Sequence, residues 1–390
     1  MEHRSDDTKI AILAPSFPPA FLGGGPAQTL NALVRAAPAT MGLSIVTPSL
    51  DLDGSPLEVT PDEWGAFQGA EVMYVSVHRA GRLVRGLLSL RRRRPEVVYI
   101  NSFFNLRLSI LPQLLSRLGF WRGATILLAP RGEMDAGALD IRAGKKRAFI
   151  TLFKLLGLHR RVVWHASAAD EARAIREVWG DSATVIVREN ETSLPLTAAT
   201  PTPHTGALRA MFYGRIAPKK GLLLALEALQ DCSRPVVFDI FGPEEDVAYS
   251  ELCRDAAARV PSNVEVTFHG PIAHARSAAV LSDHDLLLMP TSGENFGHVI
   301  AEALAGACIV MSTPHTPWTD RLEAGGGVVV ASMEPARWAR AIEEVAGADS
   351  QQRLGLRTRA AEQYNLWRSE NKGAHVFTLL DDLRSPNNAA

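Results

Sequence analysis

The chain has 390 residues, of which 46% are hydrophobic and 21% are charged, and its net charge is −1. This length predicts two or three domains of roughly 150 residues, and the composition excludes a chain that is disordered throughout. Three scattered cysteines exclude a disulfide framework and a Cys-based zinc site. No run reaches the ~18 apolar residues of a membrane span, and the first apolar stretch, 10–14, is too short for a secretory leader. We therefore expect a cytoplasmic protein.

In the first half of the chain, short apolar runs alternate with amphipathic stretches. The predicted strands are 9–14, 43–47, 72–77, 97–100, 126–129, 162–164 and 185–187. The predicted helices between them include 26–37, 106–118, 145–156 and 169–179. Runs that are apolar on both faces are typical of parallel sheets covered by helices on both sides.

A glycine-rich loop, Gly23, Gly24 and Gly25, follows the first predicted strand and precedes the first helix. Glycines let the backbone come close to a ligand, and a helix N-terminus offers free N–H groups to an anion. The G-x-G-x-x-G spacing of a dinucleotide-binding loop is absent. The loop is therefore either an anion cradle or a flexible connection.

The segment 79–161 is strongly basic, with 18 Lys or Arg and 4 Asp or Glu, an excess of +14. Such an excess on a nearly neutral protein indicates an anionic partner contacted from one side. We expect a lipid diphosphate or an anionic membrane surface, and no nucleic acid. The alternative is a set of solvated helix faces.

Two charged residues, Arg131 and Glu133, come directly after the strand 126–129. Functional side chains of parallel sheets gather beyond the carboxyl ends of the strands. We therefore interpret this pair as recognising an acceptor substrate, with a structural ion pair as the alternative. Further along, we interpret His165 as the cap of the following helix.

The proline-rich segment 195–206 has no periodic apolar pattern and is predicted to be an interdomain linker. The alternation of strands and helices then resumes. The predicted strands are 209–213, 236–241, 264–268, 286–289, 309–311 and 328–330. The predicted helices include 221–229, 247–259, 298–305 and 335–345, and the tail 352–383 is predicted to be helical.

Two loops follow the first two strands of this second half. Arg215 and Lys220 belong to the loop GRIAPKKG, 214–221. A planar guanidinium and a compact ammonium at the start of a helix suit a diphosphate, whereas the alternative is a polar turn with surface cations. Gly242 lies in a Gly-Pro turn after the next strand, where a nucleobase could stack or where the chain merely turns.

A pair of carboxylates follows the strand 286–289. Glu294 lies in the loop, and Glu302 falls in the second turn of the helix predicted to start near Gly297. The backbone N–H groups of Phe296 and Gly297 would lie at the positive end of this helix, where a phosphate binds favourably. Glu294 can then accept hydrogen bonds from a sugar and Glu302 from a ribose; the alternative is an acidic turn that caps its helix.

These motifs together resemble the retaining family 4 glycosyltransferases of the GT-B fold. The resemblance covers nearly the whole chain, and its specific parts are the Arg/Lys loop and the Glu294–Glu302 spacing. The segments PRGEM, HASAADEARAI and ENFGHVIAEALAG resemble a bacterial branch that builds cell-surface polysaccharides.

The resemblance implies an α/β fold with two facing Rossmann-like domains, a cleft between them and a C-terminal crossover helix. The implied domains are an acceptor domain at 1–194, the linker 195–206, a donor domain at 207–365 and a helix within 366–390 that packs back on the first domain. Catalytic roles fall to Arg215, Lys220 and Glu294. The residues expected to bind the nucleotide-sugar are Gly24, Gly25, Gly242, Asn295, Phe296, Gly297 and Glu302. No metal site and no cofactor are expected.

The leading hypothesis is a cytoplasmic hexosyltransferase, peripheral at the inner face of the cell membrane. It would transfer a sugar from a UDP- or GDP-sugar, with retention, to a lipid-linked saccharide in O-antigen, capsule or exopolysaccharide biosynthesis. One alternative is a family 4 enzyme with a soluble small-molecule acceptor. The other is a catalytically silent GT-B scaffold, because a fold does not fix a function.

Overall fold

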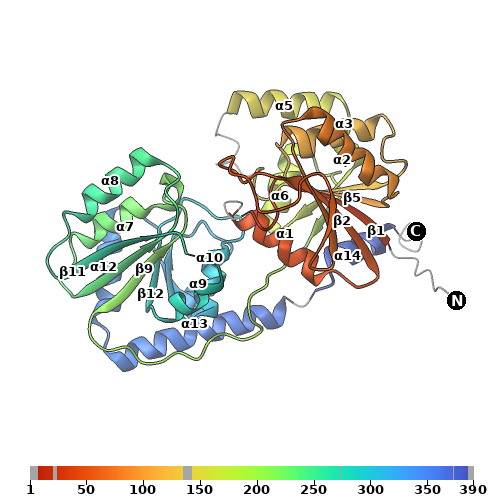
Figure 1. Cartoon of the computed structure of the whole chain (residues 1–390). Helices are drawn as coiled ribbons and strands as arrows, with labels where there is room; N and C mark the ends of the chain where they lie inside the picture. The colour runs from red at the N-terminus through yellow and green to blue at the C-terminus, as the bar shows by residue number, and fades with distance from the viewer. Residues whose placement is uncertain (1–7, 21–23, 135–142, 273, 372, 385–390) are drawn as a thin grey trace. The chain divides into compact units, whose positions relative to one another are not determined.

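The computed structural model describes residues 8–20, 24–134, 143–272, 274–371 and 373–384. The chain forms two compact units, each with a sheet between layers of helices (Figure 1). The N-terminal unit comprises Met1–Ser193 and Gly373–Ala390, and the C-terminal unit comprises Leu194–Lys372. Among the described residues, no helix has the length and apolar character needed to cross a membrane.

The N-terminal unit contains an eight-stranded sheet in the order β3-β4-β2-β1-β5-β6-β7-β8, in which β3 alone is antiparallel to its neighbour. Its strands are β1 (Thr8–Leu13), β2 (Met41–Pro48), β3 (Trp64–Phe67), β4 (Ala70–Val75), β5 (Val97–Asn101), β6 (Thr125–Ala129), β7 (Val162–Ala166) and β8 (Val185–Val187). Its helices are α1 (Gly24–Ala36), α2 (Ala80–Arg92), η1 (Leu106–Ile110), α3 (Leu111–Arg117), α5 (Ala143–Leu155), η2 (Leu158–Arg161), α6 (Ala169–Trp179) and α14 (Val376–Arg384).

Both faces of this sheet are buried, which explains the continuous apolar runs in its strands. On β1, Ile10 and Ile12 pack with α1 and α14, whereas Ala11 and Leu13 pack with α2, α5 and α6. The helix α14 thus completes the core of the N-terminal unit although it comes last in the chain.

The C-terminal unit contains a six-stranded parallel sheet in the order β11-β10-β9-β12-β13-β14. Its strands are β9 (Leu208–Tyr213), β10 (Val236–Phe241), β11 (Val264–Gly270), β12 (Leu286–Met289), β13 (Ile309–Ser312) and β14 (Gly327–Val329). Its helices are η3 (Pro218–Lys220), α7 (Leu222–Leu229), α8 (Val247–Ala257), α9 (His274–Ser282), α10 (His298–Ala305), α11 (Thr319–Arg321), η4 (Leu322–Gly326), α12 (Pro335–Gly347) and α13 (Ser350–Glu370). One core lies under α7, α8 and α12, and the other under α10 and α13.

The tail predicted to be helical over 352–383 consists of two helices, α13 and α14. Helix α13 ends at Glu370, and the amide of Asn371 closes its last turn by donating to the carbonyl of Trp367 at 2.9 Å. The chain then returns to the N-terminal unit at Gly373. There His375 Nε2 lies 3.1 Å from the carbonyl of Leu33 in α1. Residues 366–370 therefore belong to the C-terminal unit and α14 to the N-terminal unit.

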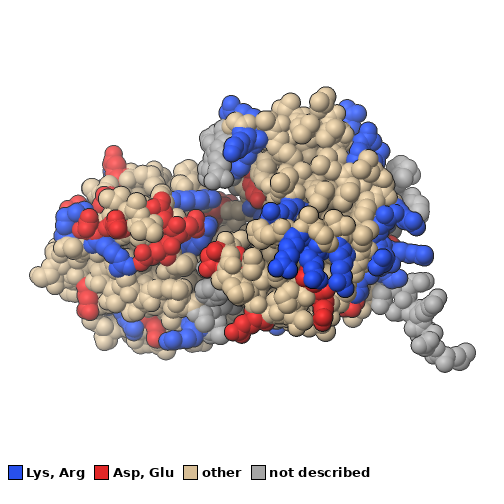
Figure 2. Space-filling model, turned by 45° about the horizontal axis from the view of Figure 1, so that its top comes forward, with Lys and Arg blue, Asp and Glu red and all other residues tan. Residues whose placement is uncertain are grey.

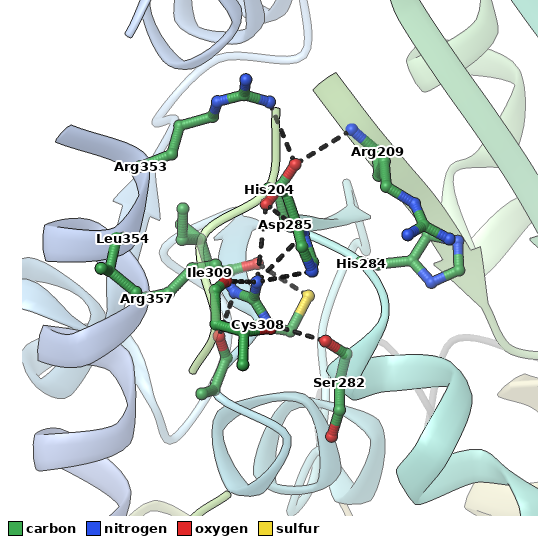
Figure 3. Close-up of polar contacts among 12 residues, drawn as sticks. His204, Arg209, Ser282, His284, Asp285, Cys308, Ile309, Arg353, Leu354 and Arg357 are labelled. Carbon is green, nitrogen blue, oxygen red and sulfur yellow. Dashed lines mark hydrogen bonds and ion pairs between the residues drawn. The ribbon is translucent and has the colours of Figure 1, made fainter. Parts of the chain in front are cut away.

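A buried ion cluster surrounds Asp285, which directly precedes β12 and has no exposed surface (Figure 3). One carboxylate oxygen lies 2.8 Å from Nδ1 of His204. The other accepts hydrogen bonds from Nη1 of Arg353 and from the backbone amide of Arg209, both at 3.2 Å. Because Arg353 comes from α13, the cluster joins that helix to the start of β12.

A second arginine of α13, Arg357, holds the segment that was predicted as a linker. Its guanidinium lies 3.8 Å from Asp285 and donates to the carbonyls of Thr202, Ser282 and Ala307 at 2.6–3.0 Å. Residues 195–206 form no helix or strand but are packed on the C-terminal unit by these contacts. The packing fixes an extended segment that has no apolar pattern of its own.

Candidate functional site

Three loops of the C-terminal unit leave the carboxyl ends of neighbouring strands. They span 214–221 after β9, 242–246 after β10 and 290–297 after β12. The three strands are parallel and adjacent, so their loops emerge at the same edge of the sheet. The loops contact one another directly: the amide of Ile216 donates to the carbonyl of Pro243 at 2.9 Å, and the amide of Ser292 donates to the carbonyl of Lys219 at 2.9 Å.

Glycines allow this close approach of backbone to backbone. A Cβ atom on Gly242 would lie 1.8 Å from the carbonyl oxygen of Gly214, and one on Gly221 would lie 2.0 Å from that of Pro290. Both glycines also have positive φ, +148° and +74°. No other residue type fits these positions, so the loops keep their arrangement only with glycine there.

We expect Gly221→Ala to destabilise the C-terminal unit by several kcal/mol, because the new Cβ atom forces Pro290 to move. Gly270→Ala is a matched control, since φ is +72° at Gly270 but nothing lies within 4 Å of the position of its Cβ. That variant should lose only about 1 kcal/mol, the cost of a left-handed conformation. Urea unfolding of both variants tests this, and equal losses would contradict the steric explanation.

The structure brings two of the predicted catalytic residues together. Nζ of Lys220 lies 2.7 Å from Oε1 of Glu294, and Oγ1 of Thr291 donates to the same oxygen at 2.9 Å. Both charged side chains are largely buried, with exposed fractions of 15% and 11%. The amide of Glu294 donates to the carbonyl of His315 at 3.0 Å, which fixes the loop that carries the carboxylate.

The third predicted catalytic residue, Arg215, lies apart from this pair. Its guanidinium forms an ion pair with Glu245, and both side chains are about half exposed. Exposed ion pairs contribute little stability, because water screens them and long side chains lose entropy in forming them. Arg215 is therefore free to exchange Glu245 for another anion.

The residues predicted to bind phosphate lie at the start of α10. Gly297 precedes the helix with φ of +76°, and Phe296, which is buried, accepts a hydrogen bond from Nε1 of Trp318 at 2.5 Å. Asn295 lies between Phe296 and Glu294 in the same loop. Among the described residues, no side chain caps the start of α10 at Gly297.

Glu302 lies in the second turn of α10 and is 5% exposed. Burial raises the pKa of its carboxyl group from 4.5 to about 7, although a hydrogen bond with Ser277 opposes the shift. The Glu302 charge in turn helps burial to raise the pKa of the nearby Tyr213 to about 12. A carboxyl group with such a pKa exists in both protonation states near neutral pH.

This raised pKa predicts a pH-dependent stability. The folded state holds the Glu302 proton more tightly than the unfolded state, so unfolding free energy is lost as the pH rises from 4.5 to 7 and above. The loss attributable to Glu302 should approach about 3 kcal/mol. Glu302→Gln should lack it. Urea unfolding at pH 5 and pH 8 measures the difference, and the same pH dependence in both proteins would contradict the assignment.

In the N-terminal unit, two of the three loop glycines are described and Gly23 lies outside the described residues. Gly24 and Gly25 form the first turn of α1, and Gly24 has φ of +56°. Nothing lies within 4 Å of the position of a Cβ on Gly24, so its own packing does not require glycine. Contact with a phosphate stays a prediction for both residues.

Arg131 is held by neutral partners rather than by a carboxylate. Its guanidinium donates to Oδ1 of Asn101 at 2.8 Å, to the hydroxyl of Tyr99 at 2.5 Å and to Asn190. Its backbone φ is +57°, which is unusual for a residue with a side chain. Asn101 ends β5, and Asn190 follows β8, so Arg131 joins the carboxyl ends of several strands.

Glu133 caps a different loop. Its carboxylate accepts hydrogen bonds from Oγ of Ser102 at 2.9 Å and from the amides of Phe103 and Phe104 at 2.5 and 3.0 Å. Burial raises its pKa, whereas these hydrogen bonds oppose the shift. Arg131 and Glu133 are therefore held by different sets of neighbours, and acceptor binding by either residue stays a prediction.

The interpretation of His165 as a helix cap is wrong. His165 lies in β7 and is buried, with Nδ1 3.1 Å from the hydroxyl of Tyr99 and Nε2 3.0 Å from the carbonyl of Arg188. Burial holds its pKa well below 6.5. At the start of α6, the carboxylate of Glu171 instead accepts hydrogen bonds from both the amide and the hydroxyl of Ser167, each at 2.7 Å. The S-x-x-x-E spacing was the sequence signal for this contact.

Residues 207–347 match the family model of glycosyl transferases group 1. The D-inositol 3-phosphate glycosyltransferase of Streptomyces griseus is 33% identical over 191 residues, which cover 46% of this chain and 40% of that relative. The enzyme of the same name from Streptomyces scabiei is 32% identical over 185 residues, which cover 44% and 41%. The matched part thus spans about two fifths of the length of these curated relatives.

Solved structures resemble the chain over almost its whole length. Anabaena HepE, solved in complex with UDP and glucose, has a TM-score of 0.70 at 16% identity and covers 97% of this chain and 98% of its own. A sucrose-phosphate synthase from Thermosynechococcus elongatus has a TM-score of 0.71 at 16% identity and covers 96% and 98%. These likenesses confirm the predicted α/β fold of the GT-B type.

Proposed function

We propose that the chain is a glycosyltransferase that transfers a sugar from a nucleotide-diphosphate sugar, with UDP or GDP as the nucleotide, to a hydroxyl group. The observation that carries the proposal is the Lys220–Glu294 pair at the carboxyl ends of β9 and β12. Both residues lie within the part of the chain that matches the group 1 model. Ligands of parallel sheets bind at this edge.

In this proposal each charged residue has a separate role. Lys220 and Arg215 bind the diphosphate and stabilise the negative charge that develops on it as the sugar leaves. The amides at the start of α10 add partial positive charge. Glu294 holds the Lys220 ammonium in place and accepts hydrogen bonds from the donor sugar, and Glu302 accepts hydrogen bonds from the ribose.

Retention of the anomeric configuration, and membership of family 4, rest on the sequence resemblance. Retention would follow from attack on the same face as the leaving diphosphate, which then takes the proton of the acceptor hydroxyl. Proton NMR that identifies the anomer formed first in the product tests whether the configuration is retained. A product with the same anomeric configuration as the donor supports retention, and the opposite configuration overturns it.

The acceptor belongs to one of two classes. A soluble small molecule is favoured by two names: the curated relatives are D-inositol 3-phosphate glycosyltransferases, and one structural neighbour is a sucrose-phosphate synthase. A lipid-linked saccharide in cell-surface polysaccharide biosynthesis is favoured by the basic segment 79–161. Transfer from a labelled donor into water-soluble or butanol-extractable product separates the two classes.

Nucleoside diphosphates should stabilise the protein if the donor site is placed correctly. We expect thermal unfolding with UDP, GDP, ADP or TDP to be shifted by one of them, with about 2.7 kcal/mol of stabilisation at 100 times its dissociation constant. Lys220→Ala should abolish the shift, and Lys219→Ala, an exposed neighbour in the same loop, should retain it. No shift with any nucleotide would favour the silent scaffold.

A further inference from the structure

Three neighbouring helices of the N-terminal unit carry many cations and no carboxylate. Helix α2 contains four arginines, α3 one, and α5 four Lys or Arg, and none of the three contains Asp or Glu. We call the outward-facing residues of α2, α3 and α5 the basic helical face. Lys and Arg predominate over Asp and Glu on the side of this unit that Figure 2 shows.

The basic helical face is continuous. The guanidinium of Arg91, at the end of α2, lies 4.8 Å from the centroid of the Phe120 ring, just after α3. Helix α3 in turn contacts η2, which contacts α5. The two helices α3 and α5 are seen close together at the top of this unit in Figure 1, with α2 beside α3. The segment η2, which contacts both α3 and α5, carries the exposed Arg160 and Arg161.

Large apolar side chains project from each of these helices among the cations. Leu118 and Leu155 are 81% and 82% exposed, and Val84, Leu88, Leu114 and Leu152 are 37–50% exposed. On α2, Leu88 lies three residues after Arg85 and four before Arg92; on α3, Leu114 lies three before Arg117. Residues at these spacings share a helix face, so the apolar and cationic side chains form mixed stripes.

Two described carboxylates pair with arginines of this region: Asp62 lies 3.6 Å from Arg82 of α2, and Glu71 forms an ion pair with Arg93 directly after α2. Glu133 is half-buried and accepts hydrogen bonds from the backbone amides of Phe103 and Phe104. Glu96 lies next to β1 at the opposite end of β5, where it accepts from the amide of Lys9. These carboxylates offset only part of the charge of the nine Lys or Arg in α2, α3 and α5, and the remaining positive charge is available to an anionic partner.

We propose that the basic helical face docks on an anionic lipid bilayer, with its leucines in the interfacial layer and its cations at the headgroups. Anionic lipids attract clustered Lys and Arg, and apolar side chains on the same helices gain free energy by leaving water. Exposed leucines interspersed with the cations do not suit a nucleic acid, which binds cations and aromatic platforms. The purpose of this docking rests on the proposed function, because docking brings a transferase to the hydroxyl group of a lipid-linked saccharide.

Flotation of the full chain with vesicles tests the proposal. We expect binding to vesicles of phosphatidylcholine with 30% phosphatidylglycerol at low salt, no binding to pure phosphatidylcholine, and weaker binding as salt screens the charges. No binding to the anionic vesicles at low salt would overturn the proposal.

Matched variants locate the docking surface. Replacing Arg85, Arg117 and Lys145 by Gln should weaken binding by on the order of 100-fold, at about fivefold for each cation. Replacing Arg259, Arg337 and Arg340 of the C-terminal unit by Gln removes the same charge and should leave binding unchanged. Equal losses in the two variants would overturn the assignment of the face, because net charge alone would then drive binding.

The leucines require a separate variant. Replacing Leu118 and Leu155 by Ser should weaken vesicle binding by about tenfold at 0.5 M salt, where the charges contribute little. Light scattering without lipid distinguishes a different partner: a dimer that the Ser variant dissociates would make this face a self-interface and overturn the proposal. Stabilisation by a nucleoside diphosphate should be the same in every variant, so the docking proposal can fail while the donor site stands.

Discussion

Asp285→Ala should lower the unfolding free energy of the C-terminal unit by about 3–5 kcal/mol. The variant leaves two buried guanidiniums, Arg353 and Arg357, without the carboxylate that compensates their charge. Burial already lowers the pKa of Arg357, and the Asp285 charge opposes that shift. Urea unfolding followed by tryptophan fluorescence measures the loss, since Trp318, Trp338 and Trp367 all lie in this unit.

Asp255→Ala is the control for this variant, because Asp255 is exposed on α8 and should cost no more than about 0.5 kcal/mol. Adding Arg353→Met and Arg357→Met to Asp285→Ala should recover part of the loss, because an apolar replacement of a buried ion cluster removes the unpaired charges. A loss below about 1 kcal/mol in Asp285→Ala would contradict the compensating role of the carboxylate.

Lys220→Ala and Glu294→Ala should each lower kcat/KM for sugar transfer by 10²–10³-fold. Lys220 would lose a preorganised charge at the leaving diphosphate, an effect worth about 3–4 kcal/mol in comparable sites. Glu294 holds Lys220 at 2.7 Å, so its removal displaces the ammonium as well as the sugar contact. Because the two residues act as a pair, the double variant should lose less than the product of the single losses.

Lys219→Ala and Glu245→Ala test whether these losses are specific. Lys219 is exposed in the same loop, and Glu245 pairs with Arg215 at the surface. Lys219→Ala should retain kcat/KM within about twofold. Glu245→Ala should retain or raise it, because it frees Arg215 for the diphosphate. Near-normal transfer by both Lys220→Ala and Glu294→Ala would remove these residues from the site.

The strands of both sheets could be predicted because their apolar runs are continuous and lie between helical stretches. Ile10 to Leu13 and Leu286 to Met289 are buried on both faces, and a run of this kind has few alternatives. The meeting of Lys220 with Glu294 also follows from the order of elements, since each comes directly after a parallel strand. In contrast, the position of Arg215 beside Glu245 depends on exposed side chains, which no periodic pattern fixes.

Other features depend on tertiary contacts that local sequence does not show. The break between α13 and α14 rests on Gly373 and on contacts of His375 with α1, more than 300 residues earlier in the chain. The Asp285 cluster joins residues from the segment 195–206, the position just before β12 and helix α13. Helix α2 is not among the helices named from the sequence, although its buried residues Leu83, Leu87 and Leu90 follow a helical spacing. Arg131 has neutral partners that come from two other strand ends.

Release of nucleoside diphosphate from a panel of UDP- and GDP-sugars, with mass spectrometry of the sugar product, tests the central claim most directly. The account predicts that one donor is consumed and that its sugar appears on a hydroxyl acceptor. It also predicts that Lys220→Ala reduces the rate at least 100-fold, whereas Lys219→Ala does not. Consumption of a donor at equal rates by the intact protein and Lys220→Ala would contradict the site, and no consumption of any donor with either acceptor class would contradict the transferase function.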